Sequence, residues 1–259
     1  MTILLVVDIG NTTTKLGVWN GAVVEAVSVA PTSEGESLAD DVSQLLAAAG
    51  AGGSRQLGVA ICSVVPQAEA FWLKWCERNG RVPFVVRGDT PSPLTNRYRA
   101  PARLGPDRLA AAVAATQRLG GPVIVASVGT AVVVDAVSPG REYLGGAIWV
   151  GMATGLATLA EHTMALPRVT PEPPSTPIGA DTEDCLRAGA VYGTAALIEG
   201  VAARMREYIG SDAPLVLTGG DAEAISPHLR AAHELIPYLT LEGIALIWEH
   251  GRGHAHANR

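Results

Sequence analysis

The sequence lacks a basic cluster, a long apolar run and any recognisable signal sequence, and each absence excludes a class of protein. Its 19 lysine and arginine residues are outnumbered by 25 aspartate and glutamate residues, the net charge is −6, and no run is rich in lysine or arginine. Binding of nucleic acid through a basic face is therefore not expected. No apolar run reaches the roughly 18 residues that a membrane-spanning helix needs, so no membrane association is expected either.

Cysteine is also scarce. Cys62, Cys76 and Cys185 are odd in number and widely spaced, which fits neither a disulfide framework nor a metal-ligand motif. A reducing cytoplasm is the compartment that this usage predicts. The 259 residues, 48% of them apolar, suffice for one large domain or two ordinary ones with cores of their own.

The most informative segment that is present reads DIGNTTTKLG, at residues 8–17, directly after the apolar run at 3–7. This pattern predicts a buried strand, a tight turn at Gly10 and a returning strand. Hydroxyl and amide side chains in such a turn can donate hydrogen bonds to phosphate oxygens, and Asp8 can bind a hydrated divalent cation beside them. A plain polar hairpin turn is the alternative interpretation.

The same arrangement recurs in PVIVASVGTAVVVD, at residues 122–135. Asp8-Ile9-Gly10-Asn11-Thr12 aligns with Ser127-Val128-Gly129-Thr130, in each case between two apolar strand patterns. Two such turns half a chain apart predict a duplicated fold that holds a ligand between its halves. Coincidence is the alternative, because Gly-Thr pairs are common in hairpins.

The remaining periodicity predicts alternating strands and helices in both halves. In the first half we expect strands at 3–8, 13–19, 22–29, 57–65 and 83–86, and helices at 36–49 and 66–79. In the second we expect a helix at 106–119, strands at 122–127, 130–136, 142–149 and 215–217, helices from 152, over 181–207, briefly after 221 and over 239–249, and a frayed tail. The predicted class is α/β, in two lobes with a cleft between them, divided into 1–104 and 105–259.

A charged pair lies where the loop at 87–104 meets the next helix. Gly105-Pro106-Asp107-Arg108 opens this helix, and proline suits a first helical turn. In a kinase, such a carboxylate could accept the proton of an attacking hydroxyl, and the guanidinium could orient an anion. An ordinary first turn that favours an acidic residue would look the same.

In this order, these segments resemble the type III pantothenate kinases, of the superfamily of actin, sugar kinases and heat-shock ATPases. The resemblance covers nearly the whole chain. It is carried by DIGNTTTKLG at 8–17, GPDR at 105–108, GTAVVVD at 129–135 and YLGGAI at 143–148, with support from TMALPRV at 163–169, IGADT at 178–182, TGG at 218–220 and LTLEGI at 239–244. It implies two duplicated ribonuclease-H-like, or actin-like, lobes, each a mixed sheet with a three-strand meander.

The resemblance also implies an activity, which is transfer of the γ-phosphoryl group of ATP to pantothenate, the first step of coenzyme A synthesis. It implies Mg²⁺ at Asp8, a monovalent cation such as K⁺ or NH₄⁺, and a cytoplasmic homodimer with the active site near its interface. The ATP contacts implied are Asp8, Ile9, Gly10, Asn11, Thr12, Thr13, Thr14, Lys15 and Thr130. The pantothenate contacts implied are Tyr98, Gly105, Pro106, Asp107, Arg108 and, across the dimer interface, Thr182, with Asp107 as general base beside Arg108.

Several positions depart from the family pattern. Ser127 stands where the family usually has an aspartate that helps to hold the monovalent cation, so binding of K⁺ should be weaker or lost. Ala100, Pro106 and Val150 replace the usual asparagine, alanine and proline. Two further hypotheses therefore stay open. One is a weakened or inactive relative that binds ligand or regulates a partner, and the other is a different small-molecule kinase or a phosphatase on the same fold.

Overall fold

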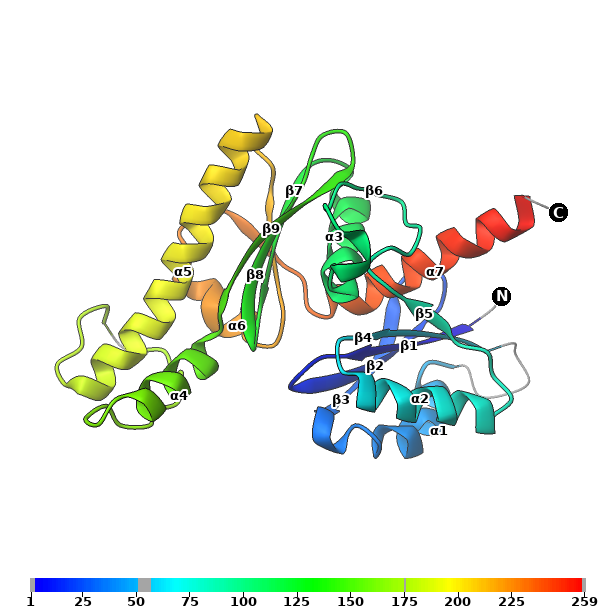
Figure 1. The fold of residues 1–259 in the computed structure, drawn as a ribbon, viewed down its shortest axis with the longest axis horizontal. Coiled ribbons are helices and arrows are strands. Elements are labelled where there is room, and N and C mark those ends of the chain that lie inside the picture. Colours follow the sequence, from blue (N-terminus) through cyan, green and yellow to red (C-terminus); the bar gives the residue numbers. More distant parts are fainter. Residues whose placement is uncertain (1–2, 51–56, 175, 258–259) are drawn as a thin grey trace. The chain divides into compact units, whose positions relative to one another are not determined.

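The computed structural model describes residues 3–50, 57–174 and 176–257, and the chain forms two compact units (Figure 1). The first unit comprises Met1–Arg118 together with Leu239–Arg259, and the second comprises Leu119–Tyr238. Within the described part of the chain, no helix is long and apolar enough to cross a bilayer.

The first unit is built on a five-stranded mixed sheet. Its strands are β1 (Ile3–Ile9), β2 (Thr13–Trp19), β3 (Val24–Pro31), β4 (Leu57–Ser63) and β5 (Phe84–Val86), in the order β3-β2-β1-β4-β5. The first three form an antiparallel meander, and β4 and β5 continue the sheet parallel to β1. The predicted meander and the strands that follow it are confirmed.

Helices pack on both faces of this sheet, and the alternation of side chains along each strand decides which residues each helix contacts. Residues 3, 5, 7 and 9 of β1 belong to a core cluster with residues of α1 (Leu38–Ala48) and α2 (Pro66–Arg78), including the buried Trp72. The opposite face carries Leu4, Val6 and Asp8, because successive side chains of a strand alternate. Helix α7 (Leu239–Ala257) packs on this face of the sheet. One contact between them is a hydrogen bond of 2.7 Å, which the Nε1 of Trp19 donates to Oε1 of Glu249.

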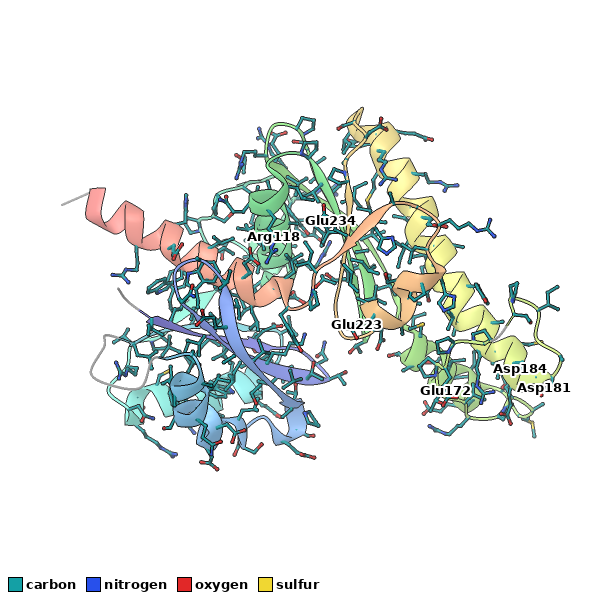
Figure 2. The ribbon with its side chains drawn as sticks, turned by 180° about the vertical axis from the view of Figure 1, so that it is seen from behind. Arg118, Glu172, Asp181, Asp184, Glu223 and Glu234 are labelled. Atoms are coloured by element: carbon teal, nitrogen blue, oxygen red, sulfur yellow. The ribbon has the colours of Figure 1, made fainter. Side chains whose placement is uncertain are left out.

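α3 (Pro106–Leu119) belongs to the first unit as well. Nε and Nη2 of Arg118, which is labelled in Figure 2, donate to the Glu242 carboxylate of α7 at 2.6 to 3.1 Å. The compact units therefore differ from the division expected after residue 104. The first unit includes α7 from the end of the chain because α7 packs on β1, β2, β4 and β5, and it includes residues 106–118 of α3, whose Arg118 pairs with Glu242 of α7.

The second unit repeats the plan. β7 (Val123–Val128), β8 (Ala131–Val137) and β9 (Glu142–Val150) form an antiparallel meander, and β10 (Leu215–Thr218) and β11 (His233–Leu235) continue parallel to β7. The order β11-β10-β7-β8-β9 has the topology of β5-β4-β1-β2-β3. The expected duplication is therefore present as topology, and not only as two similar turns.

α5 (Thr182–Ile209) packs on this second sheet, with α4 (Met152–His162) beside it and α6 (Ala222–Ile225) after β10. The core cluster joins residues such as Ile124, Leu215 and Ile198 of α5. The register of β8 and β9 shifts between Ala136 and Val137, where Ala136 lies opposite Gly145 of the double glycine, as in a β-bulge.

Some boundaries differ from expectation. The sequence pattern did not show β6 (Thr95–Asn96), β11 or the short 3₁₀ turns η1 (Thr32–Glu34), η2 (Pro101–Arg103) and η3 (Ser226–His228). The expectation of a frayed tail over 251–259 was wrong over most of its length, because α7 continues to Ala257. The last two tail residues, 258–259, lie outside the described residues, as does residue 175.

Candidate functional site

The site in the first unit begins with an ion pair near the end of β1, in which the carboxylate is buried and the ammonium group is partly exposed. Asp8 is only 6% exposed and lies opposite Lys15 of β2 in the antiparallel register. The Nζ of Lys15 is 3.8 Å from Oδ2 of Asp8. Both side chains lie on the sheet face that α7 covers, because both are in register with the alternation described above.

Burial raises the pKa of Asp8 from 3.8 to about 6, and the positive charge of Lys15 opposes this rise. The negative charge of Asp107 contributes to the rise, so the electrostatic field of the α3 terminus reaches Asp8. A buried carboxylate that is incompletely compensated by one ammonium group suits a further cation. Asp8 thus fits the predicted role of a ligand to hydrated Mg²⁺, although no group of three or more candidate ligands is clustered in the described residues.

Residues 10–12, the first glycine loop, connect β1 to β2. The N–H of Gly10 donates to the carbonyl of Thr13 at 3.0 Å and closes the loop. Asn11 and Thr12 are exposed at its tip, whereas Thr14 is fully buried. The loop therefore presents exposed amide and hydroxyl groups on a rigid base, as the sequence predicted for a phosphate-binding turn.

Thr32 at the start of η1 braces this loop, a role that the sequence pattern does not indicate. Its Oγ1 donates to the carbonyl of Gly10 at 2.7 Å, and its N–H donates to the carbonyl of Thr12 at 2.8 Å. A third contact of 3.2 Å joins the Oγ1 atoms of Thr32 and Thr14. The available signal was the meander itself, because pairing of β2 with β3 places Pro31 opposite Thr13.

The start of α3 holds the predicted acid and guanidinium groups. A Cβ atom on Gly105 would lie 2.6 Å from Oδ1 of Asp107, so the carboxylate folds back over the Gly105 backbone. Arg108 is 9% exposed, and its Cζ lies 5.7 Å from the centroid of the Tyr98 ring. The structure thus brings together Tyr98, Arg108 and the backbone at 105, three of the expected substrate contacts. Pro106 is buried at the first position of the helix.

The loop at 87–104 positions Tyr98 through its own hydrogen bonds. The Nδ2 of Asn96 donates to the carbonyl of Gly88 at 2.8 Å, and its Oδ1 accepts from the N–H of Tyr98 at 2.9 Å. At the start of the loop, the Arg87 guanidinium makes two hydrogen bonds to Glu69 of α2. The segment without periodicity is therefore an ordered loop that carries a candidate substrate contact.

Cys62 of β4 lies beside Asp8 in the parallel register. Burial raises the pKa of this thiol well above its usual range, and the negative charges of Asp8 and Asp107 act in the same direction. A thiol in such surroundings stays protonated and is a poor nucleophile or metal ligand.

In the second unit, residues 129–130, the second glycine loop, connect β7 to β8. The N–H of Gly129 donates to the carbonyl of Ala131 at 3.0 Å, which closes the loop one residue sooner than in the first unit. The carbonyl of Thr130 accepts from the N–H of Gly151 at 3.1 Å and from Oγ1 of Thr154 at 3.1 Å. Thr130, exposed at the tip, is therefore held by its backbone, and its side chain projects from an anchored turn.

Ser127 occupies the β7 position that aligns with Asp8 in β1. It is half-buried, and it is in register with Val133 of β8 and Thr218 of β10. None of these three side chains carries a charge. The nearby carboxylate of Asp135 is buried and accepts a hydrogen bond of 2.9 Å from the Tyr143 hydroxyl, so it serves the packing of β8 on β9.

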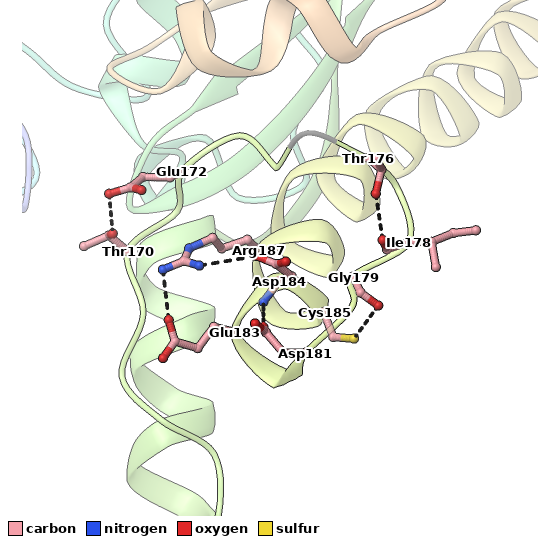
Figure 3. A network of polar contacts seen from close by, with 10 residues as sticks. All are labelled: Thr170, Glu172, Thr176, Ile178, Gly179, Asp181, Glu183, Asp184, Cys185 and Arg187. Carbon is pink, nitrogen blue, oxygen red and sulfur yellow. Dashed lines mark hydrogen bonds and ion pairs between the residues drawn. The ribbon is translucent and has the colours of Figure 1, made fainter.

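Thr182 is the first residue of α5, at a separate place in the second unit. Figure 3 shows the polar network at the start of α5, in which Oδ1 of Asp181 accepts from the N–H of Asp184 at 2.8 Å and caps the helix. Arg187 pairs with Glu183 at 3.2 Å and with Asp184 at 3.6 Å. Thr182 itself is exposed on a well-anchored helix start, where it is accessible to a partner or a ligand.

Comparison with known proteins agrees with this arrangement. The sequence model of the family described as type III pantothenate kinase matches residues 4–204. Proteins named type III pantothenate kinase are similar over almost their full length, among them one from Roseiflexus castenholzii and one from Myxococcus xanthus. The first is 37% identical over 96% of this chain and 99% of its own, and the second is 35% identical over 97% and 99%.

Solved structures show the same fold at much lower identity. The (R)-2-hydroxyglutaryl-CoA dehydratase component A of Acidaminococcus fermentans superposes with a TM-score of 0.55 and 16% identity, covering 95% of this chain and 97% of its own. The predicted α/β class with two duplicated actin-like mixed sheets is confirmed.

Proposed function

Because the chain belongs to the type III pantothenate kinase family, we propose that it transfers the γ-phosphoryl group of ATP to the primary hydroxyl of pantothenate. The product would be 4′-phosphopantothenate, and the reaction would be the first step of coenzyme A biosynthesis. The observation that carries this proposal is that one compact unit contains both the buried carboxylate of Asp8, which could bind a cation, and the carboxylate of Asp107. Phosphoryl transfer requires a held cation and an acceptor for the proton of the attacking hydroxyl.

We assign the ATP phosphates to residues 8–15. The exposed tip of the first glycine loop supplies donors, and Lys15 supplies a positive charge. Asp8 is the residue that would hold Mg²⁺, which neutralises phosphate charge when it is bound. Thr130 in the second glycine loop is the further ATP contact that we propose, supported by the anchoring of its backbone at Gly151 and Thr154.

We assign Asp107 as the general base. Its position over Gly105 fixes the carboxylate, and the first turn of α3 favours its negative charge. Arg108 and Tyr98, which lie together, would hold pantothenate, whose carboxylate suits a guanidinium. The reaction then needs little more than correct placement of the hydroxyl, a proton acceptor and compensation of charge.

Two finer assignments follow from the family. A monovalent cation, K⁺ or NH₄⁺, would bind near Ser127, but weakly, because a neutral hydroxyl replaces the carboxylate that is usual there. We also propose a cytoplasmic location, which the three free thiols support.

We propose a homodimer in which Thr182 contacts the pantothenate of the partner subunit. The second unit carries an exposed apolar group at the end of β9, with Ile148, Trp149 and Val150 exposed by 58%, 61% and 45%. Together with the exposed Leu159 of α4, these side chains supply apolar surface that an interface would bury. Light scattering coupled to gel filtration measures the mass, and a monomer would contradict the assignment of Thr182.

The deciding experiment is an assay of ADP release with pantothenate and Mg-ATP, in the presence and absence of K⁺, with mass spectrometry of the product. Pantothenate-dependent turnover with a mass increase of one phosphoryl group would establish the activity. A folded protein that releases no ADP in the presence of pantothenate and Mg-ATP would refute it. A panel of other hydroxyl substrates, tested in parallel, would show whether a different small molecule is the acceptor.

A second candidate is a weakened relative that binds ligands without turnover, as a regulator. The neutral hydroxyl of Ser127 favours it, since the monovalent cation would lose the carboxylate ligand that is usual at this position. Calorimetry that detects binding of ATP or pantothenate in the absence of turnover would support this candidate. Turnover that is independent of K⁺ would remove it.

A further inference from the structure

Arginine gathers in the loop at 87–104, although the chain as a whole is acidic. These 18 residues hold four of the 19 basic residues of the chain and only one acidic residue. Arg99 and Arg103 are exposed, and neither guanidinium makes a hydrogen bond or an ion pair with another described residue. Two positive charges in this part of the structure are therefore not neutralised by a neighbouring carboxylate, in a protein whose net charge is −6.

The backbone that carries these two arginines is tightly folded. A Cβ atom on Gly88 would lie 2.2 Å from the carbonyl oxygen of Leu104, so the start and the end of the loop are pressed together. Arg99 directly follows the candidate substrate contact Tyr98, and Arg103 is the last residue of η2. Both arginines thus extend from fixed points of an ordered loop, close in sequence to the candidate substrate contacts.

Strand topology puts this loop at the same edge of the sheet as the first glycine loop. β1, β4 and β5 are parallel, so their carboxyl ends meet at one edge. The first glycine loop follows β1, and the loop at 87–104 follows β5. The electrostatics agree, because the charges of Arg87 and Asp107, which flank the loop, both act on the pKa of Cys62 in β4. The loop therefore lies at the edge where sheets of this kind bind their ligands.

The candidate site in the first unit carries no net positive charge of its own. Asp8 lies 3.8 Å from Lys15, and Asp107 directly precedes Arg108, so two carboxylates balance two cationic groups. Both substrates of the proposed reaction, pantothenate and Mg-ATP, are anions, and the net charge of −6 on the chain repels them. Attraction of these anions over a distance therefore depends on positive charges beside the site, and the two loop arginines are such charges.

We propose that Arg99 and Arg103 attract the pantothenate carboxylate electrostatically and so promote its capture by the site. This inference rests on the proposed function and adds two residues that act before the reaction. They contribute charge rather than a directed hydrogen bond, so lysine should serve as well as arginine, and salt should abolish the effect. Arg108 differs from them, because it is buried and is the residue proposed to hold the carboxylate once it is bound.

The test measures kcat/KM for pantothenate against ionic strength in the full-length wild-type protein and in double variants. Arg99→Gln with Arg103→Gln removes both charges, Arg99→Glu with Arg103→Glu reverses them, and Arg99→Lys with Arg103→Lys keeps them. A unit charge about 10 Å from an anion changes its affinity about twofold in water, so the glutamine pair should lower kcat/KM about threefold at low ionic strength. The glutamate pair should lower it about tenfold on the same reasoning, and the lysine pair should match the wild type. In about 0.5 M NaCl all these proteins should agree, with kcat unchanged throughout.

Lys74→Gln with Arg78→Gln is the matched control. Both side chains are exposed on α2, and their replacement changes the charge of the same unit by the same amount. α2 begins after the carboxyl end of β4 and returns the chain to the start of the parallel strand β5, so its last turns lie toward the opposite edge of the sheet. The control pair should therefore keep the wild-type kcat/KM at low ionic strength.

Folding of the variants is checked by thermal unfolding, which should not change, since neither guanidinium has a partner among the described residues. An effect of the glutamine pair that persists in high salt, or that the lysine pair shares, would indicate a direct or structural contact and would overturn the proposal. An equal effect of the control pair would do the same, because the net charge alone would then explain it. If the wild-type protein releases no ADP with pantothenate, the proposed function fails and this inference with it. Turnover that is the same in the wild type and the glutamine pair at low ionic strength refutes this inference alone.

Discussion

Replacement of Asp8 by asparagine should stabilise the protein while it removes the proposed cation ligand. The folded protein holds the proton of Asp8 more tightly than the unfolded chain, because burial raises its pKa from 3.8 to about 6. At a pH below both pKa values, the carboxyl group is protonated in the folded and in the unfolded state, so it does not change the free energy of unfolding. As the pH rises through this window, the unfolded chain ionises first, so the native state loses stability relative to it. Above about pH 6 both states are ionised at this group, and the loss of folding stability stays constant.

The magnitude follows from the two pKa values. Since each pKa unit corresponds to about 1.4 kcal/mol, the charge on Asp8 costs about 3 kcal/mol at about pH 8 and about 1 kcal/mol at about pH 4.5. Asparagine has the same shape and carries no charge, so Asp8→Asn should recover most of this difference. The gain is reduced by the loss of a partner for Lys15, whose side chain is 21% exposed and stays partly hydrated.

The assay is urea unfolding at the two pH values, followed by tryptophan fluorescence. Four of the five tryptophans lie in the first unit, including the buried Trp19 and Trp72, so the signal reports the sheet that contains Asp8. Asp41→Asn, at an exposed carboxylate of α1, is the control and should change little at either pH. A gain of equal size at both pH values, or a loss at the higher one, would refute the argument from burial.

Other substitutions test the remaining assignments. Asp107→Asn should lower kcat by at least about a hundredfold with ATP binding largely kept, since general-base catalysis contributes about this much; equal loss of ATP binding in calorimetry would contradict the role of base. Gly105→Ala should also lower kcat, because its Cβ would displace the Asp107 carboxylate, whereas Gly121→Ala, where a Cβ meets nothing within 4 Å, should not. Ser127→Asp should raise activity or its dependence on K⁺ in steady-state assays, and an unchanged K⁺ response would show that this position does not limit cation binding. Thr32→Val should destabilise the first glycine loop by about 1 kcal/mol and weaken ATP binding several-fold, as the free energy of a lost hydrogen bond to Gly10 predicts; unaltered ATP affinity would count against that bracing role.

Much of the architecture was predictable because short stretches of sequence determine it. The apolar run before Asp8, the glycine after it and the alternation beyond it specify a strand, a turn and a returning strand without knowledge of distant residues. The repeat at Ser127 then predicted the duplication. Asp107 and Arg108 could also be predicted as candidate site residues from local sequence, because the proline before them marks the first turn of a helix.

What escaped prediction depends on contacts between distant segments. Thr32 braces the first glycine loop only because β3 pairs with β2, and its own surroundings in the sequence resemble an ordinary polar loop. Likewise, the helical period over 239–249 indicates a helix but not which sheet it covers, so the return of α7 to the first unit was not foreseen. Whether an aspartate before a short helix caps it also depends on the geometry of the turn rather than on residue type, and Asp221 before α6 makes no side-chain cap.

The return of α7 to the first unit has a consequence for the order of synthesis. The second unit is one uninterrupted stretch, Leu119–Tyr238, and has all its strands once that stretch has left the ribosome. The sheet face carrying Leu4, Val6 and Asp8 must instead wait for Leu239–Ala257, even though its strands are made first. The part of the protein that is translated earliest is therefore the last to be completed. During that interval its uncovered apolar face is where chaperones would bind and where aggregation would begin.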